Sequence, residues 1–88
     1  MKSLLIIWAL MEGRPSVYYE SLRTMDECQA TAKEFPQATG SVCWQASKPA
    51  VEAMMSIINA AECHRKMDME RVYICKRLPT REEFAAYE

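Results

Sequence analysis

The feature that most constrains the fold of this chain is a pairing of cysteines that occurs twice. Cys28 lies in a helix-like segment and is followed by Cys43 in a strand-like one, and Cys63 and Cys75 repeat that order further along. These four cysteines can form two disulfides, bind a metal or pack as reduced thiols in a core. Each alternative implies a different compartment, because disulfides persist in oxidising compartments and are rare in the cytosol.

The composition is that of one ordinary globular domain. The 88 residues, taken as a single domain over 1–88, suffice for one modest core but not for two. Half of the residues are hydrophobic and 26% are charged, which is not the signature of a disordered chain. The formal net charge of −1 gives no overall attraction to nucleic acid or to a membrane surface. The basic residues between Arg65 and Arg81 alternate with acidic ones, so they indicate a solvated surface rather than a nucleic-acid interface.

The hydrophobic run from Leu4 to Met11 is interpreted as a buried strand. It is too short for a membrane span, which needs roughly 20 apolar residues, and no small-x-small cleavage pattern of a signal peptide follows it. A continuous apolar run of this length is typical of a central strand covered on both faces. The turn residues 13–16 and the aromatic, β-branched segment Val17–Tyr19 predict a hairpin partner for it. No transmembrane helix is expected.

Three helices are predicted from their N-terminal signals. Residues 24–27 form a capping-box pattern that starts a helix, and Pro36 ends it. Residues 47–49 start a second helix with a proline in its first turn, and a capping box at 80–83 starts a short third one. Helical spacing then gives the inward face of the first helix as Met25, Cys28, Ala32 and Phe35, and that of the second as Val51, Met54, Ile58 and Ala61.

The remaining segments 41–46 and 71–78 have the alternation of strands, which completes the order β-β-α-β-α-β-α. The predicted fold class is α/β (α+β): a small mixed sheet of about four strands, with the helices packed on it. If the second, third and fourth strands run parallel, right-handed crossovers place the two main helices on a common face of the sheet.

For the first cysteine pair, helical spacing points the cysteine side chain toward the sheet, as a disulfide requires. Cys28 falls in the middle of the inward stripe, and Cys43 lies on a strand that can pass beneath it. A disulfide closing a loop of about 15 residues would add roughly 3 kcal/mol to the stability. Two reduced core thiols fit the same positions, because free cysteine is commonly buried. Both alternatives stay open at this point.

The second cysteine pair fails the same test. In a helix that stays regular, Cys63 points away from the apolar stripe, and Cys75 lies on the strand face opposite Ile74. A disulfide between them requires the helix to end or bend near Ala61, or to cover the face that carries Tyr73. The expectation is therefore one bridge, with Cys63 and Cys75 a weak candidate for a second.

Metal binding and catalysis have little support in the sequence. Cys63, His64 and Cys75 are suitable zinc ligands, but the close C-x₂₋₄-C pairs of structural zinc sites are absent. Adjacent residues on a helix point about 100° apart, so Cys63 and His64 do not form a catalytic pair by themselves. No phosphate-binding loop or hydrolase motif is present. The chain is expected to be no enzyme, with no catalytic residue, no cofactor and no metal.

Two surfaces are candidates for binding another protein. Tyr18, Tyr19 and Glu20 lie on the second strand of the hairpin, which is expected to be a sheet edge able to pair with a partner or a second copy of the chain. Phe84 and Tyr87 share one side of the terminal helix and could dock on a partner. A protein partner, or a homodimer through the strand edge, is expected rather than nucleic acid or a membrane.

The motifs T-M-D-E-C-Q-A at 24–30 and S-V-C-W at 41–44 follow the hairpin. With it they resemble small uncharacterised accessory proteins carried by bacteriophages and prophages, over residues 3–46. The resemblance implies an inhibitor or modulator that binds a host protein, and it identifies no site residue. The leading interpretation is a non-enzymatic binding protein of the cytoplasm with reduced cysteines. The alternatives are a disulfide-stabilised periplasmic or secreted domain and a small zinc-binding module.

Overall fold

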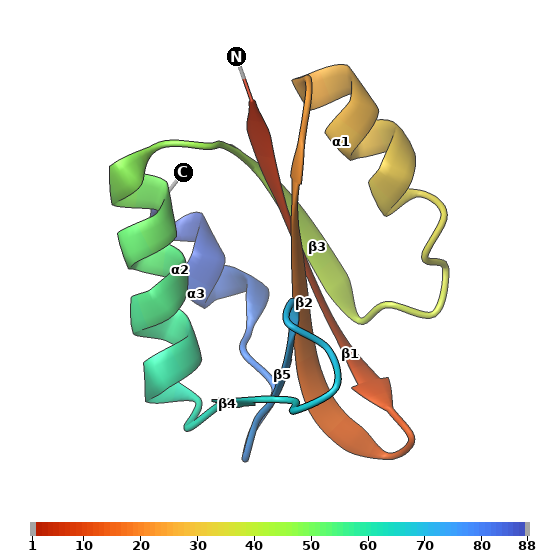
Figure 1. Ribbon diagram of the computed structural model, residues 1–88, viewed down its shortest axis with the longest axis vertical. Helices are drawn as coiled ribbons and strands as arrows, with labels where there is room; N and C mark the ends of the chain where they lie inside the picture. The colour runs from red at the N-terminus through yellow and green to blue at the C-terminus, as the bar shows by residue number, and fades with distance from the viewer. Residues whose placement is uncertain (1, 88) are drawn as a thin grey trace.

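A computed structural model describes residues 2–87 as a five-stranded antiparallel sheet with three short helices (Figure 1). In chain order the elements are β1 (Ser3–Met11), β2 (Arg14–Leu22), α1 (Met25–Ala32), β3 (Gly40–Gln45), α2 (Lys48–Ala60), β4 (His64–Arg65), β5 (Val72–Ile74) and α3 (Arg81–Ala85). The α+β class and the predicted element order are confirmed. The short strand β4 is an addition that the sequence pattern did not indicate.

The strands lie in the order β3-β1-β2-β5-β4, and every neighbouring pair is antiparallel. The sheet is therefore not mixed, and the parallel arrangement considered for the later strands is wrong. The reason is the long first strand, which is buried from Ser3 to Trp8 and takes a central place. Its two neighbours β2 and β3 both pair with it antiparallel, and β5 adds to the outer side of β2.

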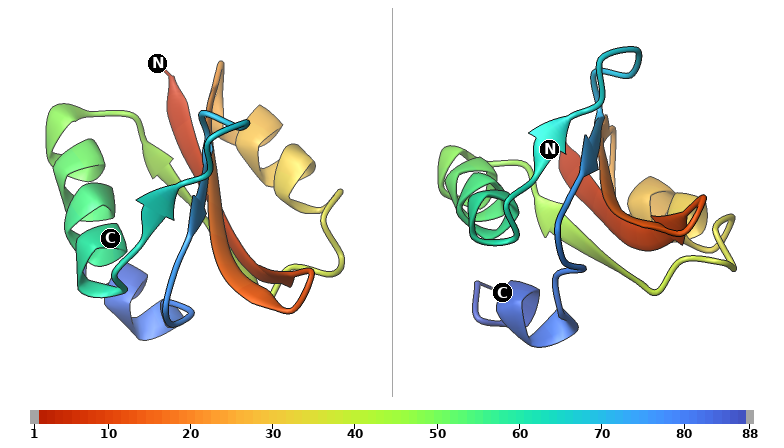
Figure 2. Two further views of the ribbon diagram at one scale, coloured as in Figure 1. Left: turned by 60° about the horizontal axis from the view of Figure 1, so that its bottom comes forward. Right: turned by 90° about the horizontal axis from the view of Figure 1, so that it is seen from below.

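The helices cover both faces of the sheet. Helix α1 lies on one face, and α2 and α3 lie on the other, as the views in Figures 1 and 2 agree. Successive residues of a strand point to opposite faces. Leu5 and Ile7 accordingly pack with Cys28 beneath α1, whereas Leu4, Ile6 and Trp8 join the core beneath α2 and α3. The two main helices thus do not share a face, because the continuous apolar run of β1 has to be buried on both sides.

The larger core is built around stacked aromatic rings. Phe84 of α3 is 1% exposed and stacks on Trp8, with ring centroids 4.4 Å apart and planes 14° apart. Its ring also packs against Trp44 at 5.8 Å. Gly40 leaves room for this arrangement, since a Cβ atom there would overlap the Trp8 indole ring. The short terminal helix is therefore a structural part of the core.

Local signals place the helix starts as expected. The Thr24 hydroxyl accepts a hydrogen bond from the Glu27 N–H over 3.0 Å, and Ser47 caps α2 in the same way. Helix α1 nevertheless ends at Ala32, because the N–H groups of Glu34 and Phe35 donate to carbonyls three residues back rather than four. Phe35 is consequently outside the helix and 42% exposed. Its predicted place on the inward face is wrong, because the residue before Pro36 is disfavoured in helical conformation.

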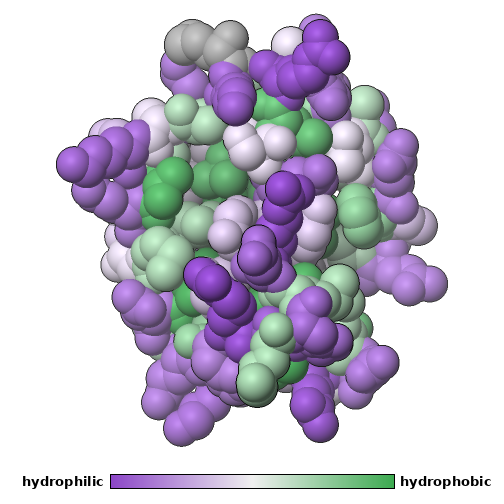
Figure 3. All heavy atoms as spheres, in the orientation of Figure 1, coloured by the Kyte–Doolittle hydropathy of each residue, from purple (hydrophilic) through white to green (hydrophobic). Residues whose placement is uncertain are grey.

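None of the helices in residues 2–87 is long and apolar enough to cross a membrane. Hydrophilic side chains are spread over the face seen in Figure 3, with hydrophobic surface exposed between them.

The Glu83 carboxylate joins the start of α3 to the segment before it. Arg77 donates to it with both terminal nitrogens, over 2.6 Å to Oε1 and 3.0 Å to Oε2. Thr80 completes a capping box, since its hydroxyl accepts from the Glu83 N–H while its own N–H donates to the carboxylate. The Arg77 hydrogen bond holds the pKa of the Glu83 carboxyl below its ordinary value.

We expect Glu83→Gln to lower the Tm by no more than a few degrees at neutral pH, with no difference from the wild type in acid. Glutamine keeps the capping hydrogen bond but removes the charge that Arg77 pairs with. Because the folded-state pKa of Glu83 is lowered, its stabilisation is present above the ordinary carboxyl pKa and is lost as the pH falls through the lowered value. Thermal unfolding from neutral to acidic pH measures the effect. Glu82→Gln is the control, and an identical pH profile for the two variants would contradict the assignment.

Candidate functional site

The four cysteines form two disulfides, and no cysteine of the described chain is left as a free thiol. Cys28 of α1 is bonded to Cys43 of β3, with the Cα atoms 6.1 Å apart. Cys28 is fully buried, and Cys43 packs in the same cluster beneath α1. Of the two alternatives for this pair, the structure has the disulfide. It ties α1 to the sheet.

The second disulfide joins Cys63 to Cys75, so the expectation of a single bridge is wrong. The physical reason lies at the end of α2. The Cys63 N–H donates to the Ile58 carbonyl and the Glu62 N–H donates to the Asn59 carbonyl, which is the Schellman arrangement of a helix C-terminus. Glu62 takes the left-handed conformation that this motif requires, with φ at 54°. The chain therefore leaves the helix before Cys63, and the helix phase no longer decides where its side chain points.

The strand side of the second disulfide is also resolved by the structure. Tyr73 and Cys75 are both buried in the core beneath α2, so this is the face of β5 that the helix covers. The Lys76 N–H donates to the Ala61 carbonyl over 3.1 Å and holds the end of β5 against the end of α2. Both conditions for a bridge are thus met: the helix ends near Ala61 and covers the Tyr73 face.

The disulfides remove the thiols that a zinc site would need. Cys63 and Cys75 are bonded to each other, so the zinc-binding interpretation that joined them with His64 is not supported. His64 itself is exposed on β4, opposite Ile74 of β5. Within residues 2–87 there is no group of three His, Cys, Asp or Glu side chains placed to hold a metal ion. The interpretation with reduced cysteines is likewise not what the structure contains.

The predicted sheet edge at Tyr18 and Tyr19 is wrong. Strand β2 lies inside the sheet, where Tyr18 is paired with Val72 of β5 and the Tyr19 N–H donates to the Arg71 carbonyl over 3.1 Å. Glu20 is engaged as well, since it accepts from the Tyr18 hydroxyl over 2.7 Å and pairs with Arg71 at 3.5 Å. Strand β5 comes from the far end of the chain, so the local sequence gave no sign that it would cover β2.

The outer strands of the sheet are β3 and β4. At β3, Arg81 of α3 donates to the Ser41 backbone carbonyl over 2.9 Å, which occupies an acceptor on the strand's outer side. Charged side chains over an edge disfavour pairing with another chain. A homodimer through β3 would have to displace this contact.

Of the two residues predicted to form a binding surface at the terminal helix, one is buried and the other is exposed. Phe84 is buried between two tryptophans and is not available to a partner, so its assignment to a binding surface is wrong. Tyr87 is 53% exposed and lies edge-on to Trp44, with ring centroids 6.3 Å apart. Helix α3 has only five residues, and its apolar side is already packed into the core through Phe84.

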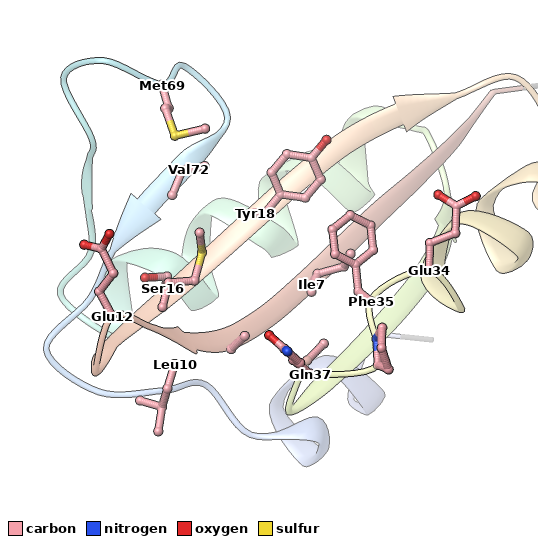
Figure 4. A pocket seen from close by; sticks show the side chains of 14 residues that line it. Ile7, Leu10, Glu12, Ser16, Tyr18, Glu34, Phe35, Gln37, Met69 and Val72 are labelled. Carbon is pink, nitrogen blue, oxygen red and sulfur yellow. The ribbon is translucent and has the colours of Figure 1, made fainter.

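The structure contains an apolar groove that the sequence pattern did not reveal. It has a volume of about 760 Å³ and lies on the α1 face of the sheet, between the loop after α1 and the segment before β5 (Figure 4). Its lining residues are Ile7, Ala9, Leu10, Met11, Glu12, Ser16, Tyr18, Glu34, Phe35, Pro36, Gln37, Ala38, Met69 and Val72. Several large hydrophobic side chains at its rim are exposed: Met69 by 45%, Met11 by 44% and Phe35 by 42%.

The groove exists because α1 is too short to cover its face of the sheet. A helix of eight residues spans about 12 Å, whereas a strand of nine residues spans about 30 Å. The far ends of β1 and β2 therefore extend past the helix with their apolar side chains uncovered. The sequence signals for this were Met11 at the end of the apolar run and Phe35 just before a proline.

The polar groups of the groove are few. Glu12 and Glu34 are the charged side chains among its lining residues, and they stand on opposite sides of it (Figure 4). Tyr18 forms part of the floor, where burial and the neighbouring Glu20 raise the pKa of its hydroxyl above the ordinary value. That hydroxyl stays protonated and donates to Glu20. Such a lining suits binding through apolar contact better than proton transfer.

No protein-family model, curated protein or solved structure matches this chain.

Proposed function

We propose that this chain is a non-enzymatic, disulfide-stabilised binding domain that works in the periplasm or outside the cell and holds a protein partner in the groove on its α1 face. The observation that carries the proposal is the combination of two disulfides with an uncovered apolar groove. The inhibitor role implied by the resemblance to phage accessory proteins is compatible with this, because an inhibitor also acts by occupying a partner's surface.

The disulfides support the oxidising compartment. Cys28–Cys43 joins α1 to β3 on one face of the sheet, and Cys63–Cys75 joins the segment after α2 to the residue after β5 on the other, so the two together fasten both helical layers. Small domains with a limited core commonly rely on disulfides of this kind outside the cytosol. With the disulfides reduced, Cys28 and Cys75 would be buried thiols that no longer hold these layers in place.

The groove supports the binding role. A contiguous apolar depression on a small domain is a common mark of an interaction site, since exposed apolar surface is otherwise kept scattered. Met11 and Met69 lie on its rim, and methionine side chains adapt readily to the shape of a partner. Phe35 lies against Tyr18, with ring centroids 6.1 Å apart, which adds a firm aromatic wall.

The compartment is tested by the thiol count of protein isolated from its own cells. Intact mass is measured after alkylation under denaturing conditions, with and without prior reduction. We expect no alkylation before reduction and four alkylated thiols after it, because all four cysteines are paired. Four reactive thiols in the unreduced protein would contradict the proposed compartment.

The binding role is tested with Met11→Gln, which places a polar group on the groove's rim, since Met11 points to the α1 face of the sheet and is 44% exposed. Partners are cross-linked in extracts of the cell envelope and compared between variants by mass spectrometry. Val51→Gln is the matched control, because Val51 is 43% exposed on α2, contrary to its predicted place on the inward face of that helix, and lies on the other side of the sheet. We expect proteins that the wild type and V51Q capture to be lost, by about tenfold or more, with M11Q. Equal capture by all three would overturn the assignment of the groove.

A further inference from the structure

The charged side chains among the groove's lining residues have one sign. Its fourteen lining residues include two carboxylates, Glu12 and Glu34, and no lysine, arginine or histidine. Glu12 belongs to the β1–β2 turn, whereas Glu34 belongs to the loop after α1, so the two come from separate parts of the fold. Between them lie the apolar floor and walls, with Ile7, Tyr18 and Phe35 in the middle of the view (Figure 4).

We infer that the groove takes a peptide segment whose apolar side chains are flanked at both ends by lysine or arginine. The inference rests on the proposed binding role and specifies its partner. Apolar side chains fill the middle of the groove, and a cation at each end meets Glu12 on one side and Glu34 on the other. Complementary charge of this kind directs choice of partner and orientation more than it adds affinity.

A peptide fits the polar groups better than a lipid or a fatty acid does. A single-chain lipid presents one head group and would leave one of the two carboxylates without a counter-charge. An anionic head group would be repelled by both. Gln37 also lines the groove, and its amide can donate to and accept from a peptide backbone. Both features favour a segment that is apolar in the middle, cationic at its ends and rich in amide groups.

The test uses three fluorescent synthetic peptides with one shared leucine- and phenylalanine-containing centre, flanked on both sides by lysine, by serine or by glutamate. Binding to the intact, oxidised protein is measured by fluorescence anisotropy. At about 50 mM salt we expect the lysine-flanked peptide to bind about five- to thirtyfold more tightly than the glutamate-flanked one. At about 500 mM salt the ratio should shrink, because exposed charges are screened.

Two charge variants locate the effect. Glu12→Gln combined with Glu34→Gln should bring the three peptides to similar affinities. Glu52→Gln combined with Glu82→Gln removes the same number of charges from exposed positions on α2 and α3 and should leave the preference intact. A preference that survives E12Q/E34Q, or three peptides that bind equally well to the wild type, would overturn the inference.

Failure of this inference and failure of the proposed function are distinguishable. If none of the peptides binds while M11Q still abolishes capture from extracts, the inferred charge pattern of the partner is wrong and the groove remains the binding site. If M11Q captures the same proteins as the wild type, the groove itself is not the binding site, and the inference falls with it.

Discussion

Removal of both disulfides is expected to unfold this domain near physiological temperature. Each bridge closes a loop of 15 or 12 residues, and loops of that size contribute about 3 kcal/mol each in the chain-entropy description. A domain of this length has a total stability of roughly 4–13 kcal/mol, at about 0.05–0.15 kcal/mol per residue. Loss of about 6 kcal/mol from both bridges therefore uses up much of that stability.

The two bridges are separated by pairwise alanine variants. Urea unfolding of Cys28→Ala/Cys43→Ala and of Cys63→Ala/Cys75→Ala should each show a loss of about 3 kcal/mol, and each variant should keep one intact bridge by mass. Reductant should destabilise the wild type strongly and leave the quadruple alanine variant unaffected. A wild type that unfolds at the same urea concentration with and without reductant would show that the bridges add no stability.

Truncation of Phe84 is expected to be the most damaging single substitution outside the cysteines. Phe84→Ala should lower the free energy of unfolding by about 3–5 kcal/mol, as is usual for loss of a fully buried phenylalanine. The ring is 1% exposed and fills the space between Trp8 and Trp44. Its removal opens a cavity under α3 and releases a helix of only five residues from the core.

Urea unfolding followed by tryptophan fluorescence measures this effect, because Trp8 and Trp44 are the only tryptophans and both contact the Phe84 ring. Phe84→Leu keeps much of the buried volume and should cost clearly less than the alanine variant. Tyr87→Ala is the matched control from the same end of the chain, and we expect it to cost about 1 kcal/mol or less since Tyr87 is 53% exposed. Equal losses for F84A and Y87A would contradict the role assigned to Phe84.

Each disulfide fixes the helical layer on a different face of the sheet. Cys28–Cys43 fixes α1, and Cys63–Cys75 fixes the end of α2 against β5. Anchoring α1 matters for the groove, because the loop that follows this helix supplies Glu34 and Phe35 to its wall. We therefore infer that the first bridge preserves the shape of the binding surface as well as the stability of the fold.

Much of the local structure was predictable because it depends on neighbours in the chain. Thr24 and Thr80 cap helices where their sequence motifs placed them. The β1–β2 hairpin was predicted, although its turn lies at Glu12 and Gly13, both with positive φ, and the predicted turn residues 14–16 belong to β2. The burial of Cys28 followed from helical spacing alone. Each of these features is decided within a few residues of sequence.

The errors arose at a local backbone conformation that the sequence did not specify and at places where distant segments meet. The direction of the Cys63 side chain was mispredicted because Glu62 adopts the left-handed conformation and ends the helix before Cys63. This conformation favours glycine, so a glutamate at this position did not indicate it. Tyr18 and Tyr19 do not lie on a sheet edge, because β5, more than fifty residues later in the chain, pairs with β2. Phe84 was assigned to the surface because a short amphipathic helix gives no indication of which partner its apolar side will find.

The sequence by itself determined the α+β class, the order of its main elements, the helix starts and the double burial of β1, since periodicity and capping act locally. The tertiary structure decided the strand order, the second disulfide and the groove. Strand order depends on which edges of β1 and β2 are still free when later strands arrive. The groove depends on the difference in length between α1 and the strands beneath it, which becomes visible only when the two are packed together.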